Sequence, residues 1–177
     1  MSRELVLFGD PGLKRMSVDV KTLDSEVVEV IKDMTRILIH KDAAGIAAPQ
    51  VGENLNIILL APRVQGWDSQ KHRHIHVLIN PVFAPEGESM ISIREGCLSL
   101  PRIREAIERP AVIRVHALDF TFEPMEFVSE GLQARVIQHE YDHLVGKTML
   151  DYLSPERLDF NKHEIKRIQK QALRSAK

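Results

Sequence analysis

Residues 138–144 read Gln138-His139-Glu140-Tyr141-Asp142-His143-Leu144, and this stretch decides how the rest of the chain is interpreted. Two histidines four residues apart lie on one face of an α-helix, so both imidazoles can reach a single metal ion. Glu140 lies one residue further along, within reach of a metal-bound water rather than of the metal itself. The pattern predicts metal-activated hydrolysis, in which the carboxylate takes the proton of that water. The alternative is a helix with two exposed histidines and no metal.

The residues around this motif predict the limits of its helix. Ser129 is a good N-cap, and Gly146 is a residue type that ends helices. Between them, apolar and functional side chains recur at three- and four-residue steps: Leu132, Val136, His139, Glu140 and His143.

A catalytic metal site of this kind needs a third protein ligand and one open position. Downstream of the motif, His163 is a candidate, but it does not lie in a recognisable ligand context. Upstream, the single cysteine of the chain lies in Glu95-Gly96-Cys97-Leu98-Ser99. A lone cysteine also fits a buried position as a small hydrophobic residue. Considered alone, the residues leave the third ligand open.

A third segment, Gly45-Ile46-Ala47-Ala48-Pro49-Gln50-Val51-Gly52, follows the first expected helix. Its small residues leave room for a substrate backbone to run alongside, and Gln50 offers an amide donor. The alternative is a tight connection between a helix and a strand.

Size and composition indicate one globular catalytic domain over residues 1–177. The formal net charge of -1 gives no reason to expect nucleic acid or an anionic membrane as a partner. The N-terminal residues show no targeting segment, and no apolar run approaches the ~20 residues that span a bilayer. We therefore expect a cytoplasmic protein.

Hydrophobic periodicity predicts the remaining elements. We expect one helix that follows a cap at Asp24 or Ser25 and ends near residues 40–44, and another from Pro155 to the C-terminus. We expect strands at 56–61, 74–83, 111–120 and 125–128. His72, His74 and His76 alternate and could bind a metal on one strand face, or lie on a solvated face. Trp67 could cover a site or anchor its loop.

Taken together, three segments resemble the signature motifs of peptide deformylases and occur in the order of that family. They are Gly45-Ile46-Ala47-Ala48-x-Gln50, Glu95-Gly96-Cys97-Leu98-Ser99 and Gln138-His139-Glu140-x-Asp142-His143-Leu144. The similarity also includes Gly9-Asp10-Pro11, Ile79-Asn80-Pro81 and Asp151-Tyr152-Leu153, so it covers nearly the whole chain. One departure is Ala43, where the family usually has glycine.

The resemblance implies an α+β fold, in which mixed and antiparallel sheets wrap around the central helix that carries the His-Glu-x-x-His motif, with a further helix at the C-terminus. It also implies removal of the formyl group from the N-terminal formyl-methionine of new polypeptides, with release of formate. The expected partners are N-formyl-methionyl peptides of nascent chains, including those at the ribosome.

The resemblance also assigns residues to roles. The implied metal ligands are Cys97, His139 and His143, holding ferrous iron (Fe2+), which zinc (Zn2+) can replace. Glu140 is the implied general base, while the Gln50 side chain and the backbone N–H of Leu98 would hold the oxyanion. The implied substrate-binding residues are Gly45, Ile46, Gly96, Leu132 and Val136, of which Ile46, Leu132 and Val136 would form the methionine pocket. Arg104 would form a functional pair with Asp42 beside the first motif, or the two would form only a surface ion pair worth under about 1 kcal/mol.

Two other functions use the same motif. A zinc endopeptidase would cleave internal peptide bonds, although a chain this short has few residues with which to line a long peptide-binding cleft. A non-catalytic module would use the metal only for folding and would close the site with a fourth protein ligand.

Overall fold

The computed structural model describes residues 2–64 and 74–175. In these ranges the chain forms the α-helices α1 (Ser25–His40), α2 (Gly131–Leu144) and α3 (Pro155–Ser175), and the 3-10 helices η1 (Pro11–Lys14), η2 (Ala48–Val51) and η3 (Met149–Tyr152). The strands are β1 (Gly45–Ala47), β2 (Ile57–Leu60), β3 (His76–Pro85), β4 (Met90–Cys97), β5 (Leu100–Pro110), β6 (Val112–Leu118) and β7 (Pro124–Glu130).

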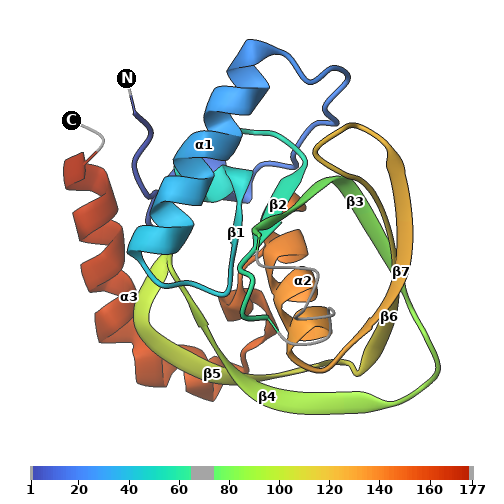
Figure 1. Ribbon diagram of the computed structural model, residues 1–177. Helices are drawn as coiled ribbons and strands as arrows, with labels where there is room; N and C mark the ends of the chain where they lie inside the picture. Colours follow the sequence, from blue (N-terminus) through green and yellow to red (C-terminus); the bar gives the residue numbers. More distant parts are fainter. Residues whose placement is uncertain (1, 65–73, 176–177) are drawn as a thin grey trace.

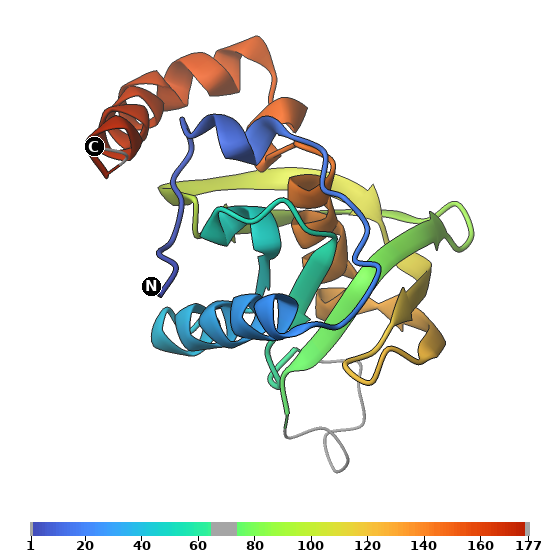
Figure 2. The ribbon, with the colours of Figure 1, turned by 90° about the horizontal axis from the view of Figure 1, so that it is seen from above.

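The strands form two antiparallel sheets around helix α2. Five strands pair in the order β1-β2-β3-β6-β7, and β4 pairs with β5 in a separate hairpin. Figure 1 shows α2 in the middle, with the five-stranded sheet curving around it and the β4–β5 hairpin passing below it. Figure 2 shows α1 and α3 on the outside of this arrangement, with both chain termini on the same side. The expected α+β architecture is confirmed.

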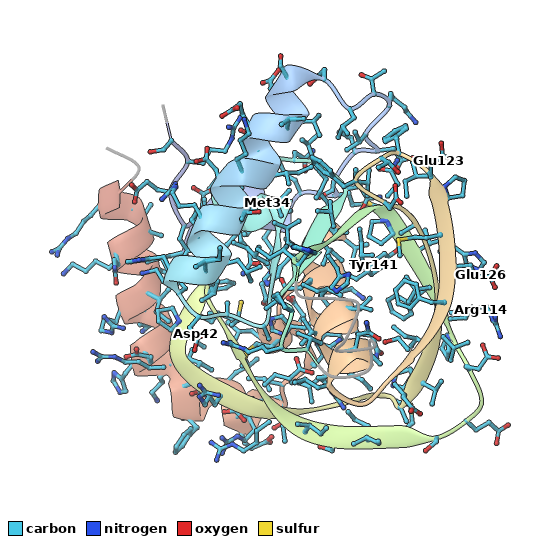
Figure 3. All side chains as sticks on the ribbon, viewed as in Figure 1. Met34, Asp42, Arg114, Glu123, Glu126 and Tyr141 are labelled. Carbon is cyan, nitrogen blue, oxygen red and sulfur yellow. The ribbon has the colours of Figure 1, made fainter. Side chains whose placement is uncertain are left out.

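Helix α2 is buried on nearly all of its sides, whereas α1 is buried on one. Most of the residues of α2 from Gln133 to Leu144 are buried, including polar and charged ones. Helix α1 instead buries one apolar face, and Figure 3 shows Met34 on the side of α1 that faces the molecule. In the same view Tyr141 of α2 lies inside the curved sheet, and Arg114 lies on its outer side. A helix buried on nearly all sides usually consists of apolar residues, so the polar residues of α2 need specific partners.

The hairpin β4–β5 was not predicted from the sequence. Most of β4 is exposed, so it lacks the alternation of buried and exposed residues that identifies a strand. In β5 the buried positions alternate, but Glu105 and Arg109 occupy two of them beside Ile103 and Ile107. Charged residues at inward positions hide the apolar period of the strand.

The predicted start of α2 was one residue too early. Glu130 is the N-cap, and Ser129 is the last buried residue of β7, where its hydroxyl donates to Gln133 Oε1 at 2.8 Å. Gly146 follows the helix with φ 71°, as a terminating residue. Within the described residues, no helix has the length and apolar character needed to cross a membrane. His72 and Trp67 lie outside the described residues.

Helix α3 is held to β5 by the buried carboxylate of Glu105. Arg157 donates to both its oxygens at 3.0 and 2.7 Å, and Asn161 donates at 2.6 Å. The Arg157 hydrogen bonds lower the pKa of Glu105 from its ordinary value of 4.5.

Replacing Arg157 by methionine is expected to lower the melting temperature by a few degrees at pH 7, because a buried carboxylate loses its cation. Since the folded-state pKa of Glu105 is depressed, this stabilisation is present above pH 4.5 and is lost as the pH falls through the folded value. Thermal melts at pH 7 and below pH 4 measure both effects. Arg167→Met is the control, since Arg167 pairs with Glu164 on the same helix. An equal loss of melting temperature in both variants at pH 7 would contradict the role of Arg157 in stabilising the Glu105 carboxylate.

Candidate active site

Three side chains that can ligate a metal meet beside α2. Cys97 ends β4, and His139 and His143 lie one turn apart on α2. Their ligand atoms all lie within 4.8 Å of one another, and all three residues are buried. Cys97 Sγ is 3.2 Å from His143 Nε2. His163, which the sequence left open as a ligand, is exposed on α3 outside this group.

The chemistry of these groups fits a divalent metal. Burial alone would raise the pKa of the Cys97 thiol, but the charge of His143 and the hydrogen bonds from both imidazoles hold it well below its ordinary value. A thiolate is the form in which cysteine binds metal. His139 Nδ1 lies 2.8 Å from Glu95 Oε2, so the other ring nitrogen is available as a ligand. One sulfur and two nitrogens suit either zinc or iron.

Glu140 is the next residue after His139, and one of its carboxylate oxygens has no hydrogen-bond partner among the described residues. This oxygen is Oε2, and it is buried. Burial is the main cause that raises the pKa of Glu140 from 4.5 to about 7, against the lowering effect of the two imidazoles. A carboxyl with a pKa near neutrality can both accept and return a proton at physiological pH.

Gln50 in η2 presents an amide donor to Cys97. Its Oε1 accepts a hydrogen bond from Ala47 N–H at 2.9 Å, which fixes the orientation of the amide. Its Nε2 then points to Cys97 Sγ at 3.6 Å and to Ser99 Oγ at 3.3 Å. The donor is therefore held at the thiol of the metal-ligand group.

The residues expected to contact substrate lie in β1, in β4, in the turn after β4 and on α2. Gly45 and Ile46 form β1, the edge strand of the five-stranded sheet. Gly96 precedes Cys97 in β4, and Leu98 lies in the turn between β4 and β5.

The two apolar pocket candidates on α2 differ in exposure. The side chain of Val136 is buried, whereas Leu132, one turn earlier, is 47% exposed. The structure therefore leaves one apolar residue open to solvent close to a buried one.

Sequence reasoning missed the charged residues that support the site. Glu95 lies in the second motif but received no role, and Arg109 and Arg135 were not singled out. Both arginines donate to Glu95, at 2.7 and 2.9 Å to its Oε1 atom. Burial opposes ionisation of Glu95, but the hydrogen bonds from His139 and Arg109 outweigh it and lower its pKa to about 2. The one available signal was that Glu105 and Arg109 alternate with Ile103 and Ile107, at the inward positions of β5.

The expected pair of Arg104 with Asp42 was wrong. The Asp42 carboxylate pairs with Arg63, which lies in the segment after β2. The guanidinium of Arg104 lies beside Gly96 instead, across the β4–β5 hairpin. Pairing across the hairpin therefore determines the position of Arg104.

Comparisons with known proteins agree with this geometry. The family model described as polypeptide deformylase matches residues 2–159. The peptide deformylase of Pseudomonas aeruginosa is 39% identical over 152 residues, covering 86% of this chain and 87% of its own. That of Maricaulis maris is 34% identical over 175 residues and 98% of both chains.

Solved structures show the same likeness. A crystal structure of a peptide deformylase from Legionella pneumophila matches with a TM-score of 0.84 and 28% identity, over 98% of this chain and 99% of that one. The Arabidopsis thaliana peptide deformylase 1B matches with a TM-score of 0.84 and 29% identity, over 95% and 91%. With the family model matching most of its residues, this chain belongs to the polypeptide deformylase family.

Proposed function

We propose that this chain is a metal-dependent hydrolase that removes the formyl group from the N-terminal formyl-methionine of new polypeptides and releases formate. The proposal rests on one cluster of side chains in this chain, together with its membership of the family. In this cluster, the ligand atoms of a thiol and two imidazoles lie within 4.8 Å of one another, next to the buried Glu140 Oε2, which makes no hydrogen bond in the part of the chain that the structure describes.

Cys97, His139 and His143 would hold the metal, and we propose Fe2+, with Zn2+ able to replace it. A bound divalent cation lowers the pKa of a water molecule and polarises the oxygen of the formyl group. The contact between Cys97 and His143 and the orientation of His139 by Glu95 support this ligand set.

The side chains of the protein would manage the proton and the developing charge. Glu140 would accept a proton from the attacking water at a carboxylate oxygen and then transfer it to the leaving amine nitrogen. Gln50 Nε2 and the backbone N–H of Leu98 would donate to the oxyanion of the tetrahedral intermediate. The hydrogen bond from Ala47 to Gln50 supports this role, because it holds the amide in a donating orientation.

The substrate would lie along the open edge of β1. We propose that Gly45, Ile46 and Gly96 hydrogen-bond an extended peptide, as an added strand. Ile46, Leu132 and Val136 would contact the methionine side chain, and the exposure of Leu132 supports a pocket open to an incoming group.

The partners follow from this reaction. They are N-formyl-methionyl peptides of nascent chains, which would be met at the ribosome in the cytoplasm. We also propose that residues 1–177 act as one catalytic domain, which the family match over residues 2–159 supports.

The backbone of Gly45 lies close to Glu140, so a side chain added at residue 45 tests how Glu140 must be positioned. A Cβ at residue 45 would lie 2.6 Å from Val136 Cγ1 and 2.9 Å from both Cγ and Oε1 of Glu140. Gly45→Ala is expected to displace Glu140 and lower kcat by about 10²-fold, since a misplacement of about 1 Å can have that effect. Steady-state formate release, normalised to bound metal, measures the change.

Gly96→Ala is the matched control for folding, because its added methyl would meet Arg104 at 3.5 Å, an ordinary contact. A smaller loss of melting temperature is expected in this variant than in Gly45→Ala. A Gly45→Ala enzyme with unchanged kcat would contradict the proposed packing against Glu140.

The function is tested by formate release from a formyl-Met dipeptide, with protein purified without oxygen and loaded with Fe2+. Rapid release of formate is expected. No formate from protein with a fully occupied metal site would overturn the proposal. Cleavage of an internal peptide bond in a longer unformylated peptide would instead identify an endopeptidase.

A further inference from the structure

A continuous chain of polar contacts runs from the surface residue Tyr152 to His139. The Tyr152 hydroxyl donates to Asp142 Oδ1 at 2.7 Å, and Asp142 Oδ2 lies 2.8 Å from Arg109 Nη1. Arg109 in turn holds Glu95 through two contacts of 2.7 and 3.0 Å. Glu95 Oε2 lies 2.8 Å from His139 Nδ1. Tyr152 is 45% exposed, whereas the other four residues are buried.

The bonding of Glu95 determines which nitrogen of His139 can bind a metal. Oε1 accepts from Arg109 Nε and Arg135 Nη1, and Oε2 accepts from Arg109 Nη2 and lies against His139 Nδ1. These four contacts occupy the roughly four acceptor positions of a carboxylate. Glu95 therefore acts only as an acceptor, His139 Nδ1 is the donor, and the lone pair of Nε2 is left for a cation.

Tyr152 contacts this chain twice. Its hydroxyl binds Asp142, and its ring lies against the guanidinium of Arg109, with Cζ 5.1 Å from the ring centroid. Arg109 is thus held by two carboxylates and one aromatic face. Burial and the hydrogen bond to Asp142 raise the pKa of Tyr152 to about 12, so the hydroxyl remains a donor at physiological pH.

We propose that Tyr152 is a positioning residue for the metal centre: acting through Asp142, Arg109 and Glu95, it orients His139 Nε2 toward the cation. The inference rests on the proposed function, since it concerns the same ligand set of Cys97, His139 and His143. It adds a residue in η3 to a metal site whose proposed ligands come from β4 and α2.

The test is Co2+ binding by the full chain, measured by competition with a chelator and by the visible absorption spectrum. Tyr152→Phe removes only the hydroxyl, and Tyr152→Leu also removes the ring contact with Arg109. Partners outside the direct ligands typically alter metal affinity about 10–100-fold. We expect about tenfold weaker Co2+ binding in Tyr152→Phe and about 100-fold in Tyr152→Leu, with the ligand-field bands shifted in both.

The chain has two tyrosines, so the second one provides a matched control. Tyr141 is closer in sequence to both histidines, but its ring packs edge-on against Phe83, with centroids 5.0 Å apart. Tyr141→Phe is expected to keep the parent affinity and spectrum. A loss of Co2+ affinity in the Tyr152 variants that follows the melting temperature of the metal-free protein, with an unshifted spectrum, would come from a less stable fold and would overturn the inference.

Unchanged Co2+ affinity and spectrum in both Tyr152 variants would overturn the inference, as would an equal change in Tyr141→Phe. A parent protein that binds Co2+ without a thiolate absorption band would overturn it too, because Cys97 would then not be a ligand. The outcome is separate from that of the formate assay, since no substrate is present. Graded Co2+ affinities together with absent deformylation would reject the proposed function alone.

Discussion

Replacing Glu140 by glutamine is expected to lower kcat for deformylation by about 10²–10⁴-fold, the usual contribution of a positioned general base. Glutamine keeps the size and polarity of the side chain but cannot accept the proton of the water or return it to the amine. Because Glu140 Oε2 makes no hydrogen bond among the described residues, the substitution breaks no contact at that oxygen. Formate release at saturating formyl-Met peptide, with metal content measured for each preparation, checks the prediction.

The control for this substitution is Glu130→Gln at the start of the same helix. Glu130 is exposed and makes no side-chain hydrogen bond as the N-cap of α2. Its replacement is expected to leave kcat unchanged. A Glu140→Gln protein that has full metal occupancy and a kcat within threefold of the parent would exclude Glu140 as the base.

Replacing Gln50 by alanine is expected to lower kcat by about 10²–10³-fold, the typical effect of losing one oxyanion donor. The amide is buried and its orientation is fixed by Ala47, so the variant loses a donor that is already oriented toward Cys97. KM for a formyl-Met peptide should change much less than kcat, since the interaction strengthens in the transition state. Steady-state kinetics on the metal-loaded variant measure both constants.

Gln133→Ala tests whether loss of any buried glutamine has the same effect. Gln133 is equally buried on α2, but it lies nearly two turns before His139 and accepts from Ser129. We expect lower stability and an unchanged kcat. If Gln50→Ala raises KM and leaves kcat intact, Gln50 binds the substrate rather than the oxyanion.

Much of the fold was predictable because short-range periodicity determines it. The helix of His139 and His143, the helix after Pro155 and the strand within residues 56–61 each follow from apolar spacing over a few turns or pairs. The β4–β5 hairpin was not predictable in this way. Its inward charges, Glu105 and Arg109, are satisfied by partners on α3, α2 and the neighbouring strand β4, which the local pattern of β5 does not contain.

The candidate site, too, was predictable from the sequence only in part. The spacing of His139 and His143 by itself predicts two ligands on one helical face. The choice between Cys97 and His163 as third ligand depended on resemblance, since Cys97 is 46 residues from His143 in the chain. A contact at that separation depends on how the strands and the helix pack.

The sequence by itself determined the class of chemistry, through His139, Glu140 and His143, and it determined the elements whose apolar residues repeat at helical or strand spacing. Only the tertiary structure decided that Glu95 holds His139, that Arg109 holds Glu95 and contacts Tyr152, and that Gly45 leaves room for Glu140. The physical reason is the separation along the chain of the residues that interact. Periodicity and motif spacing act within one element, whereas a buried charge is stabilised by donors from other elements, whose approach depends on packing of the whole chain.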